Sequence, residues 1–352
     1  MQTKAINLAL QGGGSHGAFT WGVLDRFLED ERLTIEAVTG ASAGAINAVV
    51  MAHGMATGGP GGARVALEQF WTRIGVIGNS SLFQRSFVDR MRGSWSIDNS
   101  PAFTAFDIMT RLVSPYDLNP LNLNPLRKLI EDIVDFAAIH HCGRMKLFIS
   151  ATNVRTGRVK VFSQSRLTVD KVIASTCLPL VFQAVEIDGE YYWDGGYMGN
   201  PPLWPMFYSS RSRDLVIVEI NPIEREEVPR TAHEILNRLN EITFNSSLIN
   251  ELRSIEFVGR LVDEGALDGD RYRKFLVHMI RGGHDMSALG AASKFNAELE
   301  FIQHLKQLGR AAADAWLERN FNDIGVKGTI DLSPMIRVPR PEVVQPQVTA
   351  AE

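Results

Sequence analysis

The first 55 residues contain two short apolar segments, each followed by a glycine-rich turn and then by a helical pattern. Residues 5–10 are mainly apolar and lead into glycines, and residues 18–29 carry apolar side chains at helical spacing. Residues 34–39 repeat the strand pattern before the small-residue turn at 40–44, and residues 45–52 continue as a helix. Because consecutive strand–loop–helix units form parallel sheets covered by helices, we predict an α/β fold with a mainly parallel central sheet flanked by helices.

Further strand and helix patterns follow along the chain. We predict strands over residues 145–152, 158–162, 215–220 and 274–280, and helices over 64–74, 169–175, 232–262 and 288–319. The glycine-rich cluster Gly58 to Gly62, with Pro60 inside it, is expected to be a loop.

Residues 79–124 combine poor periodicity with many large apolar side chains, among them Trp95 and Phe103. Long segments of this kind inside a compact domain are often functional loops. We therefore interpret the segment as a lid or insertion, with Trp95 and Phe103 as substrate-binding candidates. The alternative is that these side chains fill the core.

Composition and charge exclude several classes of protein. With 352 residues, of which 45% are hydrophobic and 22% charged, the chain can bury a large core. The 36 Lys and Arg residues against 40 Asp and Glu give a formal charge of -4, so no basic field favours a nucleic-acid partner. Cys142 and Cys177 are too few for a disulfide scaffold, which favours a reducing, cytoplasmic compartment.

The sequence gives no sign of export, of a membrane span or of a metal site. The first residues lack the apolar stretch of a signal peptide, and the longest apolar segment, 41–52, is shorter than the roughly 20 residues that a spanning helix needs. Any membrane contact is therefore expected to be peripheral, at the inner face. His140, His141 and Cys142 are adjacent and cannot easily wrap one ion, so we expect no metal and no cofactor.

Gly40-Ala41-Ser42-Ala43-Gly44 is a G-x-S-x-G motif between a predicted strand and a predicted helix, the context of a nucleophile elbow. A sharp strand-to-helix turn forces strained backbone angles, and only small neighbours fit beside it. Ser42 is therefore the candidate nucleophile. The alternative is a helix start that Ser42 merely caps.

Gly12-Gly13-Gly14-Ser15-His16-Gly17 forms a second glycine-rich turn between a strand and a helix. Consecutive glycines let backbone N–H groups converge on one point, and the following helix N-terminus adds positive potential, so we expect the loop to bind an anion. The spacing also satisfies G-x-G-x-x-G, with Glu36 at 19 residues after Gly17, so a dinucleotide-binding, non-hydrolytic protein is an alternative.

Asp194-Gly195-Gly196 is the third candidate, and it follows Tyr191-Tyr192-Trp193. A carboxylate at a strand end, followed by two glycines, projects into a site without a bulky neighbour. A plain β-turn is the alternative, because Asp-Gly is common in turns.

Taken in order, these three motifs resemble the patatin-like phospholipase family, which has a glycine-rich oxyanion loop, a G-x-S-x-G nucleophile and a D-G-G or D-G-A aspartate. Three weaker matches support this resemblance: Ala151-Thr152-Asn153, Ala174-Ser175 and Asn200-Pro201-Pro202. The resemblance implies a three-layer α/β/α fold and a serine lipid acyl hydrolase. It implies a catalytic dyad of Ser42 and Asp194, with Gly12, Gly13 and Gly14 as the oxyanion hole. The substrate would be a lipid or other acyl ester.

The catalytic core that we expect follows from this resemblance, and the rest of the domain organisation follows from residue patterns. A patatin-like catalytic core spans 5–222 and carries the lid or insertion at 79–124. Residues 223–333 form a helical C-terminal extension with a late strand, packed on the core. Residues 334–352 form a flexible tail, because four prolines lie between Pro334 and Pro346.

One position departs from the family pattern. The family usually has Arg or Lys before the last glycine of the loop, whereas this chain has His16. We expect His16 to contact substrate, and a positive charge there would assist the oxyanion only where the imidazole is protonated.

Two other enzyme schemes stay open. A Ser-acid-His triad is compatible with His233, His278, His284 and His304, which all follow Asp194 in the chain. An acyl-carrier acyltransferase of related architecture has His directly before the serine, and Ala41 in that position favours hydrolysis.

Overall fold

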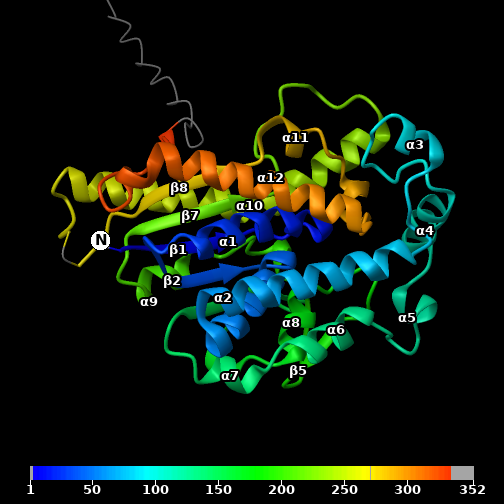
Figure 1. Ribbon diagram of the computed structural model, residues 1–352, viewed down its shortest axis with the longest axis horizontal. Coiled ribbons are helices and arrows are strands. Elements are labelled where there is room, and N and C mark those ends of the chain that lie inside the picture. The colour runs from blue at the N-terminus through cyan, green and yellow to red at the C-terminus, as the bar shows by residue number, and fades with distance from the viewer. Residues whose placement is uncertain (1–2, 270, 334–352) are drawn as a thin grey trace, which may run out of the picture.

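The computed structural model describes residues 3–269 and 271–333 (Figure 1). Its strands are β1 (Lys4–Leu10), β2 (Leu33–Gly40), β3 (Lys146–Asn153), β4 (Val159–Ser163), β5 (Val185–Ile187), β6 (Glu190–Asp194), β7 (Asp214–Glu219) and β8 (Leu276–Arg281). Within the described residues they form one sheet in the order β5-β6-β3-β2-β1-β7-β8, with β4 also paired to β3. The pairs β1–β2, β2–β3, β1–β7 and β7–β8 are parallel, which confirms the predicted mainly parallel sheet.

The helices connect these strands. They are α1 (Gly17–Glu29), α2 (Ala43–Asn79), α3 (Phe87–Met91), α4 (Pro101–Leu112), α5 (Pro115–Leu118), α6 (Pro125–Ile133), α7 (Phe136–His140), α8 (Val169–Ser175), α9 (Trp204–Ser209), α10 (Ala232–Asp263), α11 (Gly283–Ser287) and α12 (Leu299–Asn320). The short 3-10 helices are η1 (Gly14–His16), η2 (Gln164–Arg166), η3 (Gly195–Tyr197), η4 (Ala291–Phe295) and η5 (Phe321–Asp323). No described helix combines the length and the apolarity needed to cross a bilayer.

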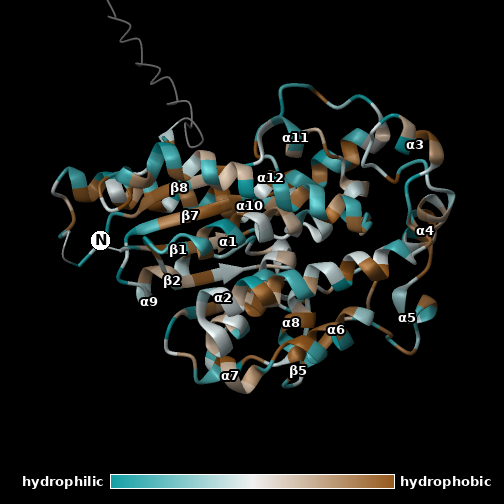
Figure 2. Ribbon diagram, viewed as in Figure 1, coloured by the Kyte–Doolittle hydropathy of each residue, from teal (hydrophilic) through white to brown (hydrophobic). Residues whose placement is uncertain are grey.

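Two cores cover the two faces of the sheet. Side chains alternate along β1, so Leu8 packs with α1, α2 and α12, while Ala9 packs with α9 and α10. Burial on both faces explains why the central strands read as continuous apolar runs. The result is the three-layer α/β/α arrangement that is visible in Figure 1, with hydrophobic strands between more polar outer helices (Figure 2).

Two sequence predictions need correction in detail. The loop predicted at 58–62 is reduced to a kink, because only Gly58 and Gly59 have non-helical backbone angles, and they separate the two helical halves of α2. Pro60 then starts the second half of the helix, a position that requires no N–H donor. The predicted helix over 288–319 is interrupted, because residues 291–295 form η4 and α12 begins only at Leu299.

The C-terminal part of the chain contributes to the same sheet. Strand β8 pairs with β7, and α12 packs along α1. The predicted Pro-rich tail at 334–352 lies outside the described residues.

Residues 79–124 form α3, α4 and α5 at one end of the molecule (Figure 1). The start of this segment is fixed to the N-terminal end of α12, because Arg85 Nε donates to Glu298 Oε2 at 2.8 Å and both side chains are buried. Trp95 stacks on Phe301 of α12 with 5.1 Å between the ring centroids.

Candidate active site

The turn between β2 and α2 has the strained geometry of a nucleophile elbow. Ser42 directly precedes α2, and its backbone angles are φ 54° and ψ -125°, a region that non-glycine residues rarely adopt. The small neighbours are required sterically, since a Cβ on Gly44 would collide with the carbonyl oxygen of Leu10. The Ser42 N–H donates to Ser175 Oγ at 3.1 Å, which helps to hold the turn. The elbow therefore presents the Ser42 side chain at the carboxyl edge of the sheet.

Asp194, the last residue of β6, lies directly opposite Ser42. Ser42 Oγ donates to Asp194 Oδ2 at 2.7 Å, and Asp194 Oδ1 accepts from the Gly196 N–H at 2.7 Å. The Asp194 N–H donates to the Cys177 carbonyl, and Thr152 Oγ1 donates to the Asp194 carbonyl, both at 2.8 Å. The two residues that the sequence placed in separate motifs thus form one hydrogen-bonded pair.

The Asp194 carboxyl is fully buried. Burial raises its pKa from 3.8 to about 6, although the hydrogen bonds from Ser42 and Gly196 act in the opposite direction. At neutral pH the carboxylate is ionised but more basic than an exposed one. It is therefore suited to accept a proton from its hydroxyl partner.

The glycine loop follows β1 and reaches the same edge of the sheet. Gly12 abuts the elbow, because a Cβ on it would lie 2.5 Å from Ser42 Cβ. The Gly12 N–H donates to Asn200 Oδ1 at 2.7 Å, and the Gly12 carbonyl accepts from Asn221 Nδ2 at 2.8 Å. In the part of the chain that the structure describes, the backbone N–H groups of Gly13 and Gly14 have no hydrogen-bond partner. The loop that abuts the elbow therefore has two backbone donors without a described protein partner.

His16 is an interior residue. Its Nε2 lies 2.8 Å from Ser293 Oγ, and the ring is almost completely buried. Burial, and secondarily the charge of Lys294, lower its pKa to about 3. The imidazole is neutral at physiological pH, so His16 does not carry the positive charge that the family places at this position.

Trp95 and Phe103 are engaged in packing. Trp95 stacks on Phe301 and on His304, and Phe103 contacts Phe83 and Phe295 at centroid distances of 6.0 Å and 5.6 Å. These side chains bind the 79–124 segment to α12 and η4.

The histidines of the alternative triad do not contact Asp194 where the structure describes their side chains. His278 bonds to Asp214 at 3.0 Å, and His304 stacks on Trp95 at 5.0 Å. The side chain of His233 lies outside the described part. No described group of three His, Cys, Asp or Glu residues could hold a metal ion.

The acidic residue of the alternative dinucleotide fingerprint is also occupied. Glu36 accepts from the backbone N–H groups of Arg211 and Ser212 at 2.7 Å and 2.8 Å. Its carboxylate therefore joins β2 to the segment before β7 and is not available to bind a ribose hydroxyl.

Several residues around the glycine loop carry no local motif signal of their own. Gln11 Oε1 accepts from the N–H groups of Ile220 and Asn221, both at 2.9 Å, and Gln11 Nε2 donates to Asn245 Oδ1 at 3.0 Å. Only Asn200 and Ser175 lie in sequence stretches that resemble the family. Gln11 directly precedes the loop, whereas its partners Asn221 and Asn245 lie 210 and 234 positions away and required the fold to be found.

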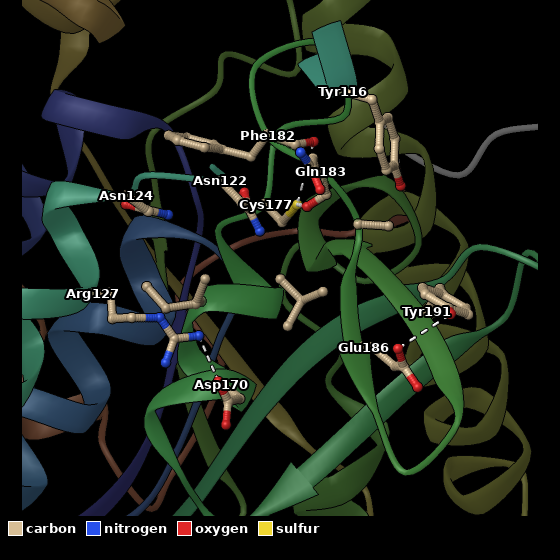
Figure 3. A pocket seen from close by; sticks show the side chains of 13 residues that line it. Tyr116, Asn122, Asn124, Arg127, Asp170, Cys177, Phe182, Gln183, Glu186 and Tyr191 are labelled. Carbon is tan, nitrogen blue, oxygen red and sulfur yellow. Dashed lines mark hydrogen bonds and ion pairs between the residues drawn. The ribbon is translucent and has the colours of Figure 1, made fainter. Parts of the chain in front are cut away.

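A cavity of about 320 Å³ lies beside the site (Figure 3). Its walls include the Arg127–Asp170 ion pair, Tyr191 and Phe182. Cys177, whose carbonyl accepts from the Asp194 N–H, connects the cavity to the site, although Ser42 and Asp194 are not part of its lining.

The chain was compared with known proteins. Among solved structures, the chain is similar to VipD from Legionella pneumophila, with 15% identity, a TM-score of 0.37 and coverage of 86% of this chain and 66% of VipD, which is just under two thirds. It is also similar to a chain of the heterodimeric ExoU-SpcU complex from the type III secretion system of Pseudomonas aeruginosa, with 17% identity, a TM-score of 0.31 and coverage of 96% and 68%. Curated proteins gave no match.

The family assignment rests on the sequence match and not on these distant structures. Residues 8–207, which are 200 of the 352 residues, match the family described as patatin-like phospholipase. The match contains the glycine loop, the elbow and Asp194. The chain belongs to the patatin-like phospholipase family.

Proposed function

We propose that this protein is a serine-dependent lipid acyl hydrolase that cleaves carboxylic esters through an acyl-enzyme on Ser42. The proposal covers phospholipase A, lysophospholipase and broader carboxylesterase activity. The observation that carries it is the 2.7 Å hydrogen bond from Ser42 Oγ to Asp194 Oδ2. An activated nucleophile requires a base within hydrogen-bonding distance, and here that base is a carboxylate in place of the more common histidine.

In the acylation step, Ser42 Oγ attacks the ester carbonyl carbon while its proton passes to Asp194. The N–H groups of Gly13 and Gly14 stabilise the oxyanion that forms. The Gly12 N–H is bonded to Asn200, so Gly12 shapes the hole next to Ser42, and Gly13 and Gly14 donate. When the tetrahedral intermediate collapses, Asp194 returns the proton to the departing alkoxide.

In the deacylation step, the Asp194 carboxylate accepts a proton from a water molecule as the oxygen of that water attacks the acyl carbonyl. The second intermediate releases the carboxylic acid, and the proton returns to Ser42 Oγ. Each cycle thus consumes one ester and one water and restores the dyad.

A substrate panel tests the assignment. Purified protein is given short-chain esters, phospholipids and lysophospholipids, with Ser42→Ala as the control, and saturable NAD binding is measured in parallel. Ester turnover that requires Ser42 supports the proposal. Saturable NAD binding without Ser42-dependent turnover supports the non-hydrolytic alternative instead.

The pH dependence follows from the Asp194 carboxyl. Its raised pKa of about 6 means that the base becomes protonated, and inactive, as the pH falls through that value. We expect kcat/KM on a soluble ester to fall about tenfold from its plateau to pH 5. Thermal melting at each pH excludes acid unfolding as the cause. A profile that stays flat down to pH 4.5 would contradict Asp194 as the base.

We further propose that the protein meets its substrate at a lipid surface through α3 and α4. Large apolar side chains are exposed on these helices and just before α3, with relative exposures of 81% for Leu82, 77% for Phe87, 74% for Met91 and 78% for Leu112. Hydrophobic residues on α3 and α4 are visible at this end of the molecule in Figure 2. Because each buried side chain of this size contributes about 1.5–3 kcal/mol, partial insertion of several would hold the protein at a membrane.

Replacing these four residues by serine is expected to lower activity on long-chain phospholipid vesicles at least tenfold and to leave activity on a soluble ester unchanged. Exposed side chains contribute little to folding, so thermal stability should hold. Tyr208→Ser with Val228→Ser, two exposed residues elsewhere, serves as the matched control. Equal losses on both substrates, or none on vesicles, would refute the docking role.

A further inference from the structure

The oxyanion loop lies against η4, a segment from the far end of the chain. Ser293 in η4 contacts His16, and the backbone of Lys294 is seated directly on Gly14. Gly14 has φ +57°, and a Cβ there would collide with the Lys294 carbonyl oxygen. Only glycine permits this approach, so Lys294 is held in a fixed position relative to the loop.

The Lys294 side chain begins a chain of hydrogen bonds that ends in the loop. Its Nζ donates to Asn221 Oδ1 at 2.7 Å, and Asn221 Nδ2 donates to the Gly12 carbonyl at 2.8 Å. The Gly12 carbonyl and the Gly13 N–H belong to the same peptide group. A cation at one end therefore polarises, through two hydrogen bonds, the N–H that we assign to the oxyanion hole.

The charge of this ammonium is not neutralised by a close partner. The charged and titratable groups that act on it are Glu241, Arg225 and the neutral His16. Glu241 is bonded to Arg225 and to Arg238, and no carboxylate of the described residues lies within 4.0 Å of Lys294 Nζ. The ring of Phe244 is 5.9 Å away. In such surroundings a positive charge acts over a longer distance than in water.

We propose that Lys294 is a positioning residue of the oxyanion hole, whose ammonium acts through Asn221 to polarise the Gly12–Gly13 peptide. This inference rests on the proposed function. Lys294 lies outside the family match at residues 8–207. In this proposal it supplies the positive charge that His16 does not carry.

The charge on Lys294 titrates in an accessible range. Burial lowers its pKa to about 8, with Arg225 acting in the same direction and Glu241 against it. The ammonium is present below that pH and is lost as the pH rises through it. The activity profile should therefore have a falling alkaline limb near pH 8, separate from the rising limb of Asp194.

The test compares Lys294→Met and Lys294→Arg with the wild type on a soluble ester. Lys294→Met is expected to lower kcat roughly ten- to hundredfold with little change in KM, less than the 10²–10³-fold typical of losing an oxyanion donor outright. Lys294→Arg should retain most of the activity and should move the alkaline limb to higher pH, because a guanidinium does not deprotonate there. Lys128→Met, which removes an exposed ammonium, is the matched control.

The outcomes separate this inference from the proposed function. Ser42-dependent turnover in the wild type, with Lys294→Met within twofold of it, would overturn the role of Lys294 alone. Equal losses in folded Lys294→Met and Lys294→Arg, with the alkaline limb unmoved, would also overturn it, since they indicate a packing role. A coupling test adds Asn221→Leu. In the double variant, the loss of kcat from Asn221→Leu should not add to the loss from Lys294→Met. Additive losses would contradict an action of Lys294 through Asn221.

Discussion

Ser42→Ala and Asp194→Asn are each expected to lower kcat on a soluble ester by about 10⁴-fold or more, the scale seen when a member of a hydrolase catalytic unit is removed. In the proposed mechanism Ser42 supplies the nucleophilic oxygen, and Asp194, whose Oδ2 accepts a hydrogen bond from Ser42 Oγ at 2.7 Å, is the base. Because neither works without the other, the double variant should be little slower than the slower single variant. The measurement is kcat and kcat/KM for all four proteins, each checked for folding by its melting curve.

Histidine variants provide the control for this experiment. His233→Asn, His284→Asn and His304→Asn should retain substantial turnover, since the carboxylate of Asp194 is bonded to Ser42 and Gly196. A folded histidine variant as inactive as Ser42→Ala would establish a triad in place of the dyad. Additive losses in the Ser42 and Asp194 double variant would show that the two residues act independently.

Asp194→Asn is also expected to raise the free energy of unfolding at neutral pH while it abolishes activity. The wild-type carboxyl has a pKa of about 6 in the folded protein, against an ordinary value of 3.8. The protonated carboxyl contributes fully to the free energy of unfolding below pH 3.8, and this contribution is lost as the pH rises to about 6. The difference corresponds to about 3 kcal/mol at roughly 1.4 kcal/mol per pKa unit. An asparagine keeps an acceptor for Gly196 and avoids the cost of a buried charge.

Denaturant unfolding of both proteins at pH 4 and pH 7.5 measures this effect. The variant should be more stable by up to about 3 kcal/mol at pH 7.5, and the two proteins should converge at pH 4. Ser42→Ala, which keeps the carboxyl, is the matched control for loss of the hydrogen bond. An Asp194→Asn variant that is less stable than the wild type at both pH values would show that the ionised Asp194 carboxylate does not destabilise the folded protein.

Ser42 and Asp194, which the structure joins by a hydrogen bond, could be singled out from the sequence because their signals are local. Each lies at a strand end among small residues, and each strand pattern could be recognised from a few neighbouring side chains. Parallel neighbours end at the same edge of a sheet, and β1 and β2 are such neighbours, so the glycine loop and the elbow lie together.

The surroundings of the loop could not be predicted in this way. The contacts of Gly12 with Asn200 and Asn221 join residues 188 and 209 positions apart. Asn200 lies in a stretch that resembles the family, but nothing local shows that it bonds to the loop, and Asn221 has no distinctive local pattern. Trp95 and Phe103 illustrate the same limit, because an apolar side chain in an aperiodic segment has the same sequence signature whether it faces substrate or the interior. Only the fold shows that both pack against η4 or α12.

Covalent labelling can establish whether Ser42 is the activated nucleophile. The wild type, Ser42→Ala and Asp194→Asn are treated with a fluorophosphonate, and the adduct is located by intact mass and peptide mapping. We predict one adduct per chain on Ser42 in the wild type, none in Ser42→Ala and much slower labelling in Asp194→Asn. Labelling at another residue, or ester turnover that survives in Ser42→Ala, would contradict the proposed mechanism.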